Sequence, residues 1–318
     1  MDRAVTVACV QVEPVILDRE RTIDKIEEVA AEAARNGAEL VVFPETFVPV
    51  YPSSLWAKAF AGWQSDEAKA TFARLAQNSV AVGSPSEQRL AACARELGIW
   101  LVTGVNEVEA DRPGTIYNAL LYHAPDGTLA LHHRKLVPTN HERLLWGQGD
   151  GRGLNTVQAP FGRLGGLICW ENYMPLARFA VYEAGVEIYI ASTADDSDAW
   201  QATLVHIARE SRAYVVSPCV FQRASAYPDD FPLRADLEGV PTLGRGGSAV
   251  LAPDGSYLAG PLFDEEGILY AELDPSRLLA ERQRFDPVGH FHRPDVLRLG
   301  VSPSARAGDA KPSTRPSA

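Results

Sequence analysis

Cys169 lies where a reactive thiol would be well placed. It stands in the segment Gly-Arg-Leu-Gly-Gly-Leu-Ile-Cys-Trp-Glu-Asn-Tyr-Met-Pro-Leu, residues 162–176. The apolar first half is typical of a buried strand, and the proline near the end is typical of a first helical turn. Open α/β folds carry reactive groups at such strand ends, and a helix start can favour the thiolate. A cysteine in an apolar strand is also an ordinary small core residue, so this segment alone leaves both interpretations open.

Two charged residues occupy similar positions elsewhere in the chain. Glu45 directly follows the apolar segment 40–43 and Pro44, which closes a strand ladder. Lys135 ends another predicted strand, and Pro138 follows it three residues later. Each charge taken alone would more often be a solvated surface charge. Together with Cys169 they supply a carboxylate, an ammonium and a thiol, a set that suits attack on a polarised carbon–nitrogen bond.

These three motifs resemble those of the nitrilase superfamily of carbon–nitrogen hydrolases. Glu45 stands in Phe-Pro-Glu, Lys135 in Arg-Lys-Leu-Val-Pro-Thr and Cys169 in Cys-Trp-Glu. The resemblance extends over about residues 5–299, nearly the whole chain. Within the superfamily the chain is most similar to the true nitrilase branch. Three groups of residues carry this similarity: 169–172, 142–143 together with 146–151, and 286–291 together with 293–295.

The resemblance implies a reaction that needs no cofactor. Cys169 would attack a nitrile carbon to form a thioimidate, and loss of ammonia would leave a thioester that water cleaves to the acid. Glu45 would act as general base, and Lys135 would stabilise negative charge. Glu142 would be the second glutamate of the site and keep Lys135 charged. Without the resemblance, a surface carboxylate at a helix start would be the preferred interpretation of Glu142.

Two other functions stay open. An amidase or carbamoylase of the same superfamily would use the same four residues. Trp170 to Asn172 and the motif at 286–295 favour the nitrile, but the chemistry does not exclude an amide. A non-catalytic assembly protein could keep the fold, although a scaffold has no need of all four residues. Ammonia release from a nitrile and its matching amide would separate the three.

Aromatic residues near Glu45 suggest a substrate pocket. The irregular segment 48–63 is rich in proline and aromatic residues, and it could line a pocket or simply pack in the core. We expect Tyr51, Trp170 and Glu171 to contact substrate. Such a pocket would take aryl-aliphatic or medium aliphatic groups.

Alternating strand and helix patterns must position these residues, as expected for a layered α/β domain. The resemblance implies a four-layer α-β-β-α sandwich, which pattern alone does not separate from a doubly wound sheet. The segment 224–245 could be a surface loop or part of an oligomer contact. We expect strands at 5–12, 39–43, 99–105, 116–123, 127–133, 154–158, 163–168, 187–191, 214–220, 248–252 and 268–273, and helices at 18–36, 66–78, 86–97, 174–183 and 200–211.

Composition narrows the class of protein further. The 318 residues are 46% hydrophobic and carry a net charge of −11, which argues against a nucleic-acid partner. No apolar run reaches the ~18 residues that a membrane span needs, and the N-terminus shows no signal peptide. The four cysteines form no CxxC pair and the seven histidines show no ligand spacing, so we expect no metal.

These features predict a cytoplasmic enzyme, because a reducing compartment keeps Cys169 reduced. We expect one domain over residues 1–301 and a disordered tail over 302–318. The resemblance implies homo-oligomers that are built from dimers and often extend into spirals.

Overall fold

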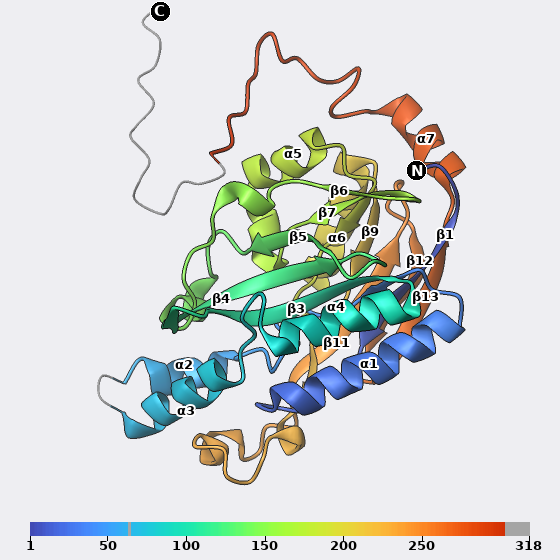
Figure 1. Cartoon of the computed structure of the whole chain (residues 1–318). Coiled ribbons are helices and arrows are strands. Elements are labelled where there is room, and N and C mark those ends of the chain that lie inside the picture. Colours follow the sequence, from blue (N-terminus) through green and yellow to red (C-terminus); the bar gives the residue numbers. More distant parts are fainter. Residues whose placement is uncertain (63–64, 303–318) are drawn as a thin grey trace, which may run out of the picture.

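Two β-sheets lie face to face at the centre of the computed structural model, and helices cover the outer face of each sheet (Figure 1). The structure describes residues 1–62 and 65–302. The predicted four-layer α-β-β-α sandwich is therefore confirmed. None of the helices within the described ranges is long and apolar enough to cross a membrane.

The first sheet contains the strands that precede Glu45 and Lys135. Its order is β13-β1-β2-β3-β4-β5, with β1, β2 and β3 parallel and the other neighbours antiparallel. The strands are β1 (Val5–Gln11), β2 (Leu40–Val42), β3 (Trp100–Glu109), β4 (Arg112–His123), β5 (Leu129–Arg134) and β13 (Gly267–Leu273).

The second sheet contains the strand that precedes Cys169. Its order is β10-β11-β9-β8-β7-β6, with β12 paired to β11. β7, β8 and β9 are parallel, so this half repeats the arrangement of β1, β2 and β3. The strands are β6 (Val157–Ala159), β7 (Gly162–Gly166), β8 (Ile188–Ile190), β9 (Tyr214–Ser217), β10 (Phe221–Arg223), β11 (Thr242–Leu251) and β12 (Tyr257–Phe263).

Helices on both outer faces begin at residues that cap their first turn. Asp18 and Ser84 accept hydrogen bonds from backbone N–H groups at the starts of α1 (Arg19–Arg35) and α4 (Pro85–Leu97), which cover the first sheet. Ser197 caps α6 (Asp198–Ser211), which covers the second sheet beside α5 (Pro175–Glu183). The remaining helices are α2 (Ser54–Phe60), α3 (Asp66–Gln77) and α7 (Pro275–Arg284).

Successive side chains of each central strand point alternately into two different layers of the core. Val7 and Cys9 face the second sheet and share a buried cluster with its Ile190, whereas Ala8 and Val10 pack beneath α1 and α4. Successive side chains of a strand point to opposite faces of the sheet, so a sheet whose strands are apolar on both faces must be covered by other elements on both faces. Burial on both faces explains why the strand segments of the sequence are almost continuously apolar.

Several elements differ from the sequence-based expectation. The predicted strand 214–220 ends at Ser217, because Pro218 has no N–H to continue the ladder. The segment 48–63 was predicted to be irregular, but it contains α2. Trp63 and the predicted tail from residue 303 onward lie outside the described residues. The prediction also missed β10, β12 and α7.

The segment 224–245 is packed rather than loosely looped. Its side chains Tyr227 and Phe231 lie against Trp56 of α2, with the ring centroids of Phe231 and Trp56 5.3 Å apart. The indole of Trp56 donates a hydrogen bond to the Tyr227 hydroxyl. This segment therefore covers the helix that follows the Glu45 loop.

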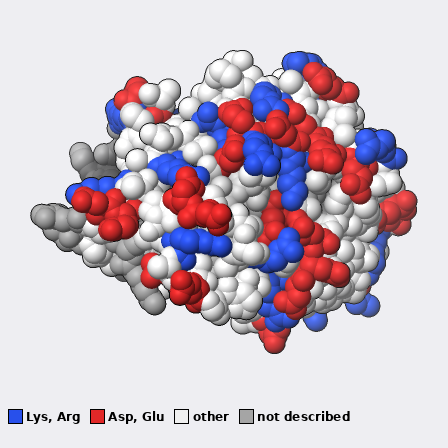
Figure 2. Space-filling view, turned by 90° about the horizontal axis from the view of Figure 1, so that it is seen from below, with Lys and Arg blue, Asp and Glu red and all other residues white. Residues whose placement is uncertain are grey.

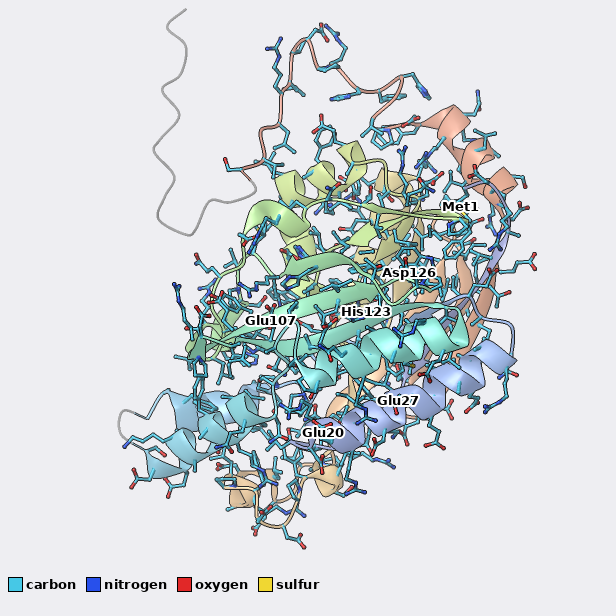
Figure 3. The ribbon with its side chains drawn as sticks, in the orientation of Figure 1. Met1, Glu20, Glu27, Glu107, His123 and Asp126 are labelled. Atoms are coloured by element: carbon cyan, nitrogen blue, oxygen red, sulfur yellow. The ribbon has the colours of Figure 1, made fainter. Side chains whose placement is uncertain are left out.

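Charged residues of both signs alternate over the surface that Figure 2 shows. One such group joins α1 to α4: the guanidinium of Arg89 lies 2.7 Å from Asp24 and 2.7 Å from Glu27. Arg89 also lies 3.3 Å from Glu20, and Glu20 and Glu27 stand along α1 in Figure 3. Such exposed pairs contribute little stability each, and they leave no single basic surface on this face.

Candidate active site

Cys169 occupies a sharp turn between the second sheet and α5. It begins the 3-10 helix η3 (Cys169–Tyr173), and its φ of 51° is rare for a residue other than glycine. Its backbone N–H donates to Ser192, and its Sγ accepts a hydrogen bond from Thr193 Oγ1 at 3.1 Å. The side chain is 4% exposed. The surrounding contacts fix this strained backbone, which is typical of functional residues.

Ser192 also connects this turn to the Glu45 loop of the first sheet. Its backbone oxygen accepts from Cys169, and its hydroxyl donates to the backbone oxygen of Phe43 at 3.3 Å. Phe43 lies two residues before Glu45. The loops that carry the thiol and the carboxylate are therefore neighbours across the two sheets.

Glu45 is a buried carboxylate with unequal oxygens. Its Oε1 accepts from Lys135 Nζ at 2.9 Å and from Asn118 Nδ2 at 2.6 Å. Its Oε2 has no hydrogen-bond partner among the described residues. Gly104 of β3 makes room for the loop, since a Cβ there would lie 2.1 Å from the Pro44 oxygen. One oxygen of Glu45 thus anchors the carboxylate, and the other is available for a proton.

Lys135 lies between two carboxylates with its side chain fully buried. Its Nζ is 2.9 Å from Glu45 Oε1 and 2.8 Å from Glu142 Oε2. The backbone N–H of Lys135 donates to Asn118, which continues the β4–β5 pairing by one residue. The Trp146 ring lies below the ammonium, with its centroid 5.9 Å away.

Glu142 makes contacts that fit both interpretations that the sequence presented as alternatives. It lies in the 3-10 helix η1 (Asn140–Leu144), where its Oε2 accepts from the backbone N–H of Thr139 at 2.7 Å. The same oxygen accepts from Lys135, and Oε1 accepts from the Tyr51 hydroxyl at 2.9 Å. Glu142 therefore caps a helical turn and contacts Lys135 at the same time.

Burial and charge shift the pKa values of these groups. Burial raises the pKa of the Cys169 thiol, the nearby Glu45 carboxylate raises it further, and Lys135 opposes both. Burial likewise raises the pKa of Glu45, although the charge of Lys135 offsets part of that effect. Burial alone would lower the pKa of Lys135, but the carboxylates of Glu45 and Glu142 outweigh it and the pKa is raised. The resting site therefore holds an ammonium and a protonated thiol that needs a base.

The residues expected to contact substrate fall in three different environments. Tyr51 joins the site through Glu142. The Trp170 side chain is half-exposed, and its indole N–H donates to Asp195 at 2.7 Å. Glu171 is buried, and both of its carboxylate oxygens accept hydrogen bonds from protein donors.

Sequence reasoning missed Asn118 and Thr193. Asn118 lies in the predicted strand 116–123, where an amide among apolar neighbours was a usable signal because buried polar groups need partners. Thr193 follows β8 with no comparable signal. Within residues 1–62 and 65–302, no group of three or more His, Cys, Asp or Glu residues is arranged to hold a metal ion.

The fold and the enclosed thiol, carboxylates and ammonium together define a class of hydrolase. A sequence model of the family described as carbon-nitrogen hydrolase matches residues 6–283. The chain belongs to this carbon-nitrogen hydrolase family, whose members act on carbon–nitrogen bonds. The resemblance drawn from the three motifs is thereby confirmed.

Relatives and solved structures agree with this assignment. The chain is 44% identical to "Aliphatic nitrilase" of Sinorhizobium fredii, over 92% of this chain and 94% of the relative. It is 40% identical to "Nitrilase 1" of Arabidopsis thaliana, over 95% and 88% of the two chains. A carbon-nitrogen hydrolase from Helicobacter pylori has the same fold, with a TM-score of 0.72 at 21% identity over 92% of this chain and 97% of that chain.

Proposed function

We propose that this protein is a nitrilase that hydrolyses an organic nitrile to the carboxylic acid and ammonia. One observation carries the proposal: a buried lysine lies between two carboxylates, beside the loop of a buried cysteine. The 44% identity to a protein named an aliphatic nitrilase supports the nitrile as substrate. Glu45, Lys135, Glu142 and Cys169 form the proposed catalytic site.

The first half of the reaction forms a covalent thioimidate. The Cys169 thiol gives its proton to Glu45, whose Oε2 is without another partner among the described residues, and the sulfur adds to the nitrile carbon. Negative charge then develops on the nitrile nitrogen, and the compact ammonium of Lys135 stabilises it. The proton returns to that nitrogen.

The second half releases ammonia and then the acid. Glu45 takes a proton from water as its oxygen adds to the thioimidate carbon, and it passes that proton to the nitrogen, which gives a tetrahedral intermediate with a hydroxyl and an amino group. Glu45 then transfers the hydroxyl proton to the amino nitrogen as the C–N bond breaks, so ammonia leaves and a thioester remains. A second water cleaves the thioester to the acid and restores the thiol. Throughout, Glu142 keeps Lys135 charged and in position.

Ammonia release from a nitrile and from its matching amide tests this function. A nitrilase releases ammonia from the nitrile, and Cys169→Ala abolishes the release. Turnover of the amide alone would assign the protein to the amidases or carbamoylases, which can use the same four residues. Turnover of neither compound over a series of chain lengths would support a non-catalytic assembly protein instead.

We propose further that the substrate is an aryl-aliphatic or medium aliphatic nitrile and that the enzyme needs neither a metal nor an organic cofactor. It works in the cytoplasm as a homo-oligomer that is built from dimers and can extend into spirals. The reactive thiol needs a reducing compartment. Exposed apolar side chains near the start of α5 support an oligomer. Light scattering and electron microscopy of the purified protein test this state, and a monomer at micromolar concentration would contradict it. These apolar side chains are Trp170, Tyr173, Met174 and Leu176.

A further inference from the structure

One buried carboxylate, that of Glu171, connects the two sheets at the active site. Its Oε2 accepts from His133 Nε2 at 2.8 Å and from the backbone N–H of Ile168 at 2.9 Å. Its Oε1 accepts from the backbone N–H of Leu136 at 2.8 Å. His133 belongs to β5 of the first sheet, whereas Glu171 and Ile168 follow β7 of the second. We call Glu171 and His133 the intersheet pair.

The partners of Glu171 are the immediate surroundings of two reacting groups. His133 and Leu136 lie on either side of Lys135 in the chain, and Ile168 directly precedes Cys169. Each of these contacts therefore restrains the backbone within two residues of the ammonium or the thiol. Glu171 is thus bonded to the chain neighbours of both Lys135 and Cys169.

The intersheet pair is enclosed, and its carboxylate is ionised. The side chains of both residues are fully buried. Burial alone would raise the pKa of Glu171, but His133 and the two backbone donors lower it, so the carboxylate is retained. Gly153 packs closely on the histidine, since a Cβ there would lie 2.5 Å from His133 Nδ1. These contacts leave the pair no direct access to substrate, so it can act on the reaction only through Lys135 and Cys169.

We propose that Glu171 and His133 are positioning residues that determine which bond of the tetrahedral intermediate breaks. The inference rests on the proposed nitrile hydrolysis. The carbon of that intermediate carries the Cys169 sulfur, a hydroxyl, an amino group and the substrate chain. If the nitrogen receives the proton, the C–N bond breaks, and ammonia and a thioester result. If the sulfur receives the proton, the C–S bond breaks, and the amide and the free thiol result.

The position of Lys135 decides between these two outcomes. The proton comes from Glu45, whose Oε1 is bonded to Lys135 at 2.9 Å. A displaced Lys135 therefore displaces both the positive charge and the proton donor relative to the nitrogen. A misplacement of about 1 Å costs on the order of a hundredfold in rate for a well-aligned step. Loosening the intersheet pair should slow C–N cleavage and raise the share of amide.

Three variants test the intersheet pair. Glu171→Gln removes the charge and turns an N–H₂ group toward N–H donors. His133→Asn shortens the side chain so that its amide no longer reaches Glu171, whereas His133→Gln keeps an N–H donor near the position of Nε2. The acid and the amide that form from one nitrile are quantified by chromatography, together with kcat and KM. We expect Glu171→Gln and His133→Asn to lower kcat about tenfold or more and to raise the amide share several-fold, with KM within about twofold. His133→Gln should keep kcat and the amide share near those of the wild type.

A second buried histidine–carboxylate pair supplies a matched control. His123 of β4 has its Nε2 2.7 Å from Glu87 of α4, and its side chain is also fully buried. His123 lies on the sheet that α4 covers, as Figure 3 shows, and neither residue contacts the catalytic groups. We expect His123→Asn to lower the thermal midpoint as much as His133→Asn does, while the ratio of amide to acid stays unchanged.

The possible outcomes separate the inference from the proposed function. An unchanged product ratio in His133→Asn, or an equal shift in His123→Asn or His133→Gln, would overturn the positioning role. If Glu171→Gln does not fold, the His133 variants decide alone. If the wild type hydrolyses an amide but no nitrile, the proposed function fails. The intersheet pair is then tested by kcat on that amide, which should fall in His133→Asn and persist in His133→Gln.

Discussion

The side-chain amide of Asn118 donates to Oε1 of Glu45 over 2.6 Å, in the interior of the protein. The ammonium of Lys135 donates to the same oxygen. Two donors on one oxygen fix the plane of the carboxylate and leave Oε2 as the more basic position. Asn118 is therefore a determinant of where Glu45, the proposed general base, takes its proton.

Asn118→Leu should lower kcat about tenfold to a hundredfold and displace the pH profile. Glu45 must be ionised to act as a base, so kcat/KM rises as pH increases through its pKa. Burial places that pKa above the ordinary value of about 4.3, and the Asn118 hydrogen bond acts to lower it. Removing the bond should move the acid limb of the profile to higher pH. An acid limb at the same pH as in the wild type would contradict this role.

Cys169→Ala should abolish turnover and leave the thermal midpoint nearly unchanged, because the thiol is small and its loss removes the nucleophile. Mass spectrometry of the wild type with a slowly reacting nitrile should find the adduct on Cys169. Cys9 provides the control, since it is equally buried but belongs to β1 of the core. We expect Cys9→Ala to retain activity, and an adduct on Cys9 would refute the assignment.

Lys135→Arg should lose activity by more than a hundredfold, about 2.7 kcal/mol in barrier. The guanidinium is planar and wider than the ammonium, and the side chain it would replace is fully buried between Glu45 and Glu142. Lys25 of α1, which is partly buried and pairs with Glu266, provides the control, and Lys25→Arg should have no effect on rate. Steady-state kinetics decide the matter: activity within about tenfold of the wild type would show that Lys135 does not contact the reacting atoms.

Glu142→Gln should affect both rate and stability, because Glu142 accepts hydrogen bonds from Lys135 and from the backbone of Thr139. We expect kcat to fall at least about a hundredfold and the thermal midpoint to fall by a few degrees. Turnover and unfolding should be measured on the same preparation. A lowered midpoint with a normal rate would leave Glu142 as a helix cap alone and reduce the site to three residues.

The family resemblance predicted the layers, and the motifs pointed to the four residues of the proposed site, but neither could predict a hydrogen-bond partner such as Asn118. The apolar strand patterns indicated which segments are buried on both faces. Asn118, by contrast, reaches Glu45 because β4 pairs with β3 in the register that places Asn118 opposite Asn106. A shift of one residue would turn the amide to the other face of the sheet. Such a register depends on turns and packing that no local pattern specifies.

Glu142 shows a second limit of sequence reasoning. From the chain alone, a capping carboxylate and a catalytic carboxylate were competing interpretations. In the structure the two interpretations are compatible, because a carboxylate has several lone pairs and Glu142 uses them for Thr139, Lys135 and Tyr51 together. The number of partners that one side chain serves becomes visible only in three dimensions.

The division of the site between two sheets couples chemistry to the spacing of the layers. Glu45 and Lys135 follow strands of one sheet, and Cys169 and Thr193 follow strands of the other. A small expansion of the interior, too slight to unfold either sheet, would move Glu45 and Lys135 away from Cys169. On heating, turnover should therefore be lost reversibly several degrees below the temperature at which circular dichroism detects unfolding. Activity then reports a loosening of the interior that spectroscopy of the sheets does not detect.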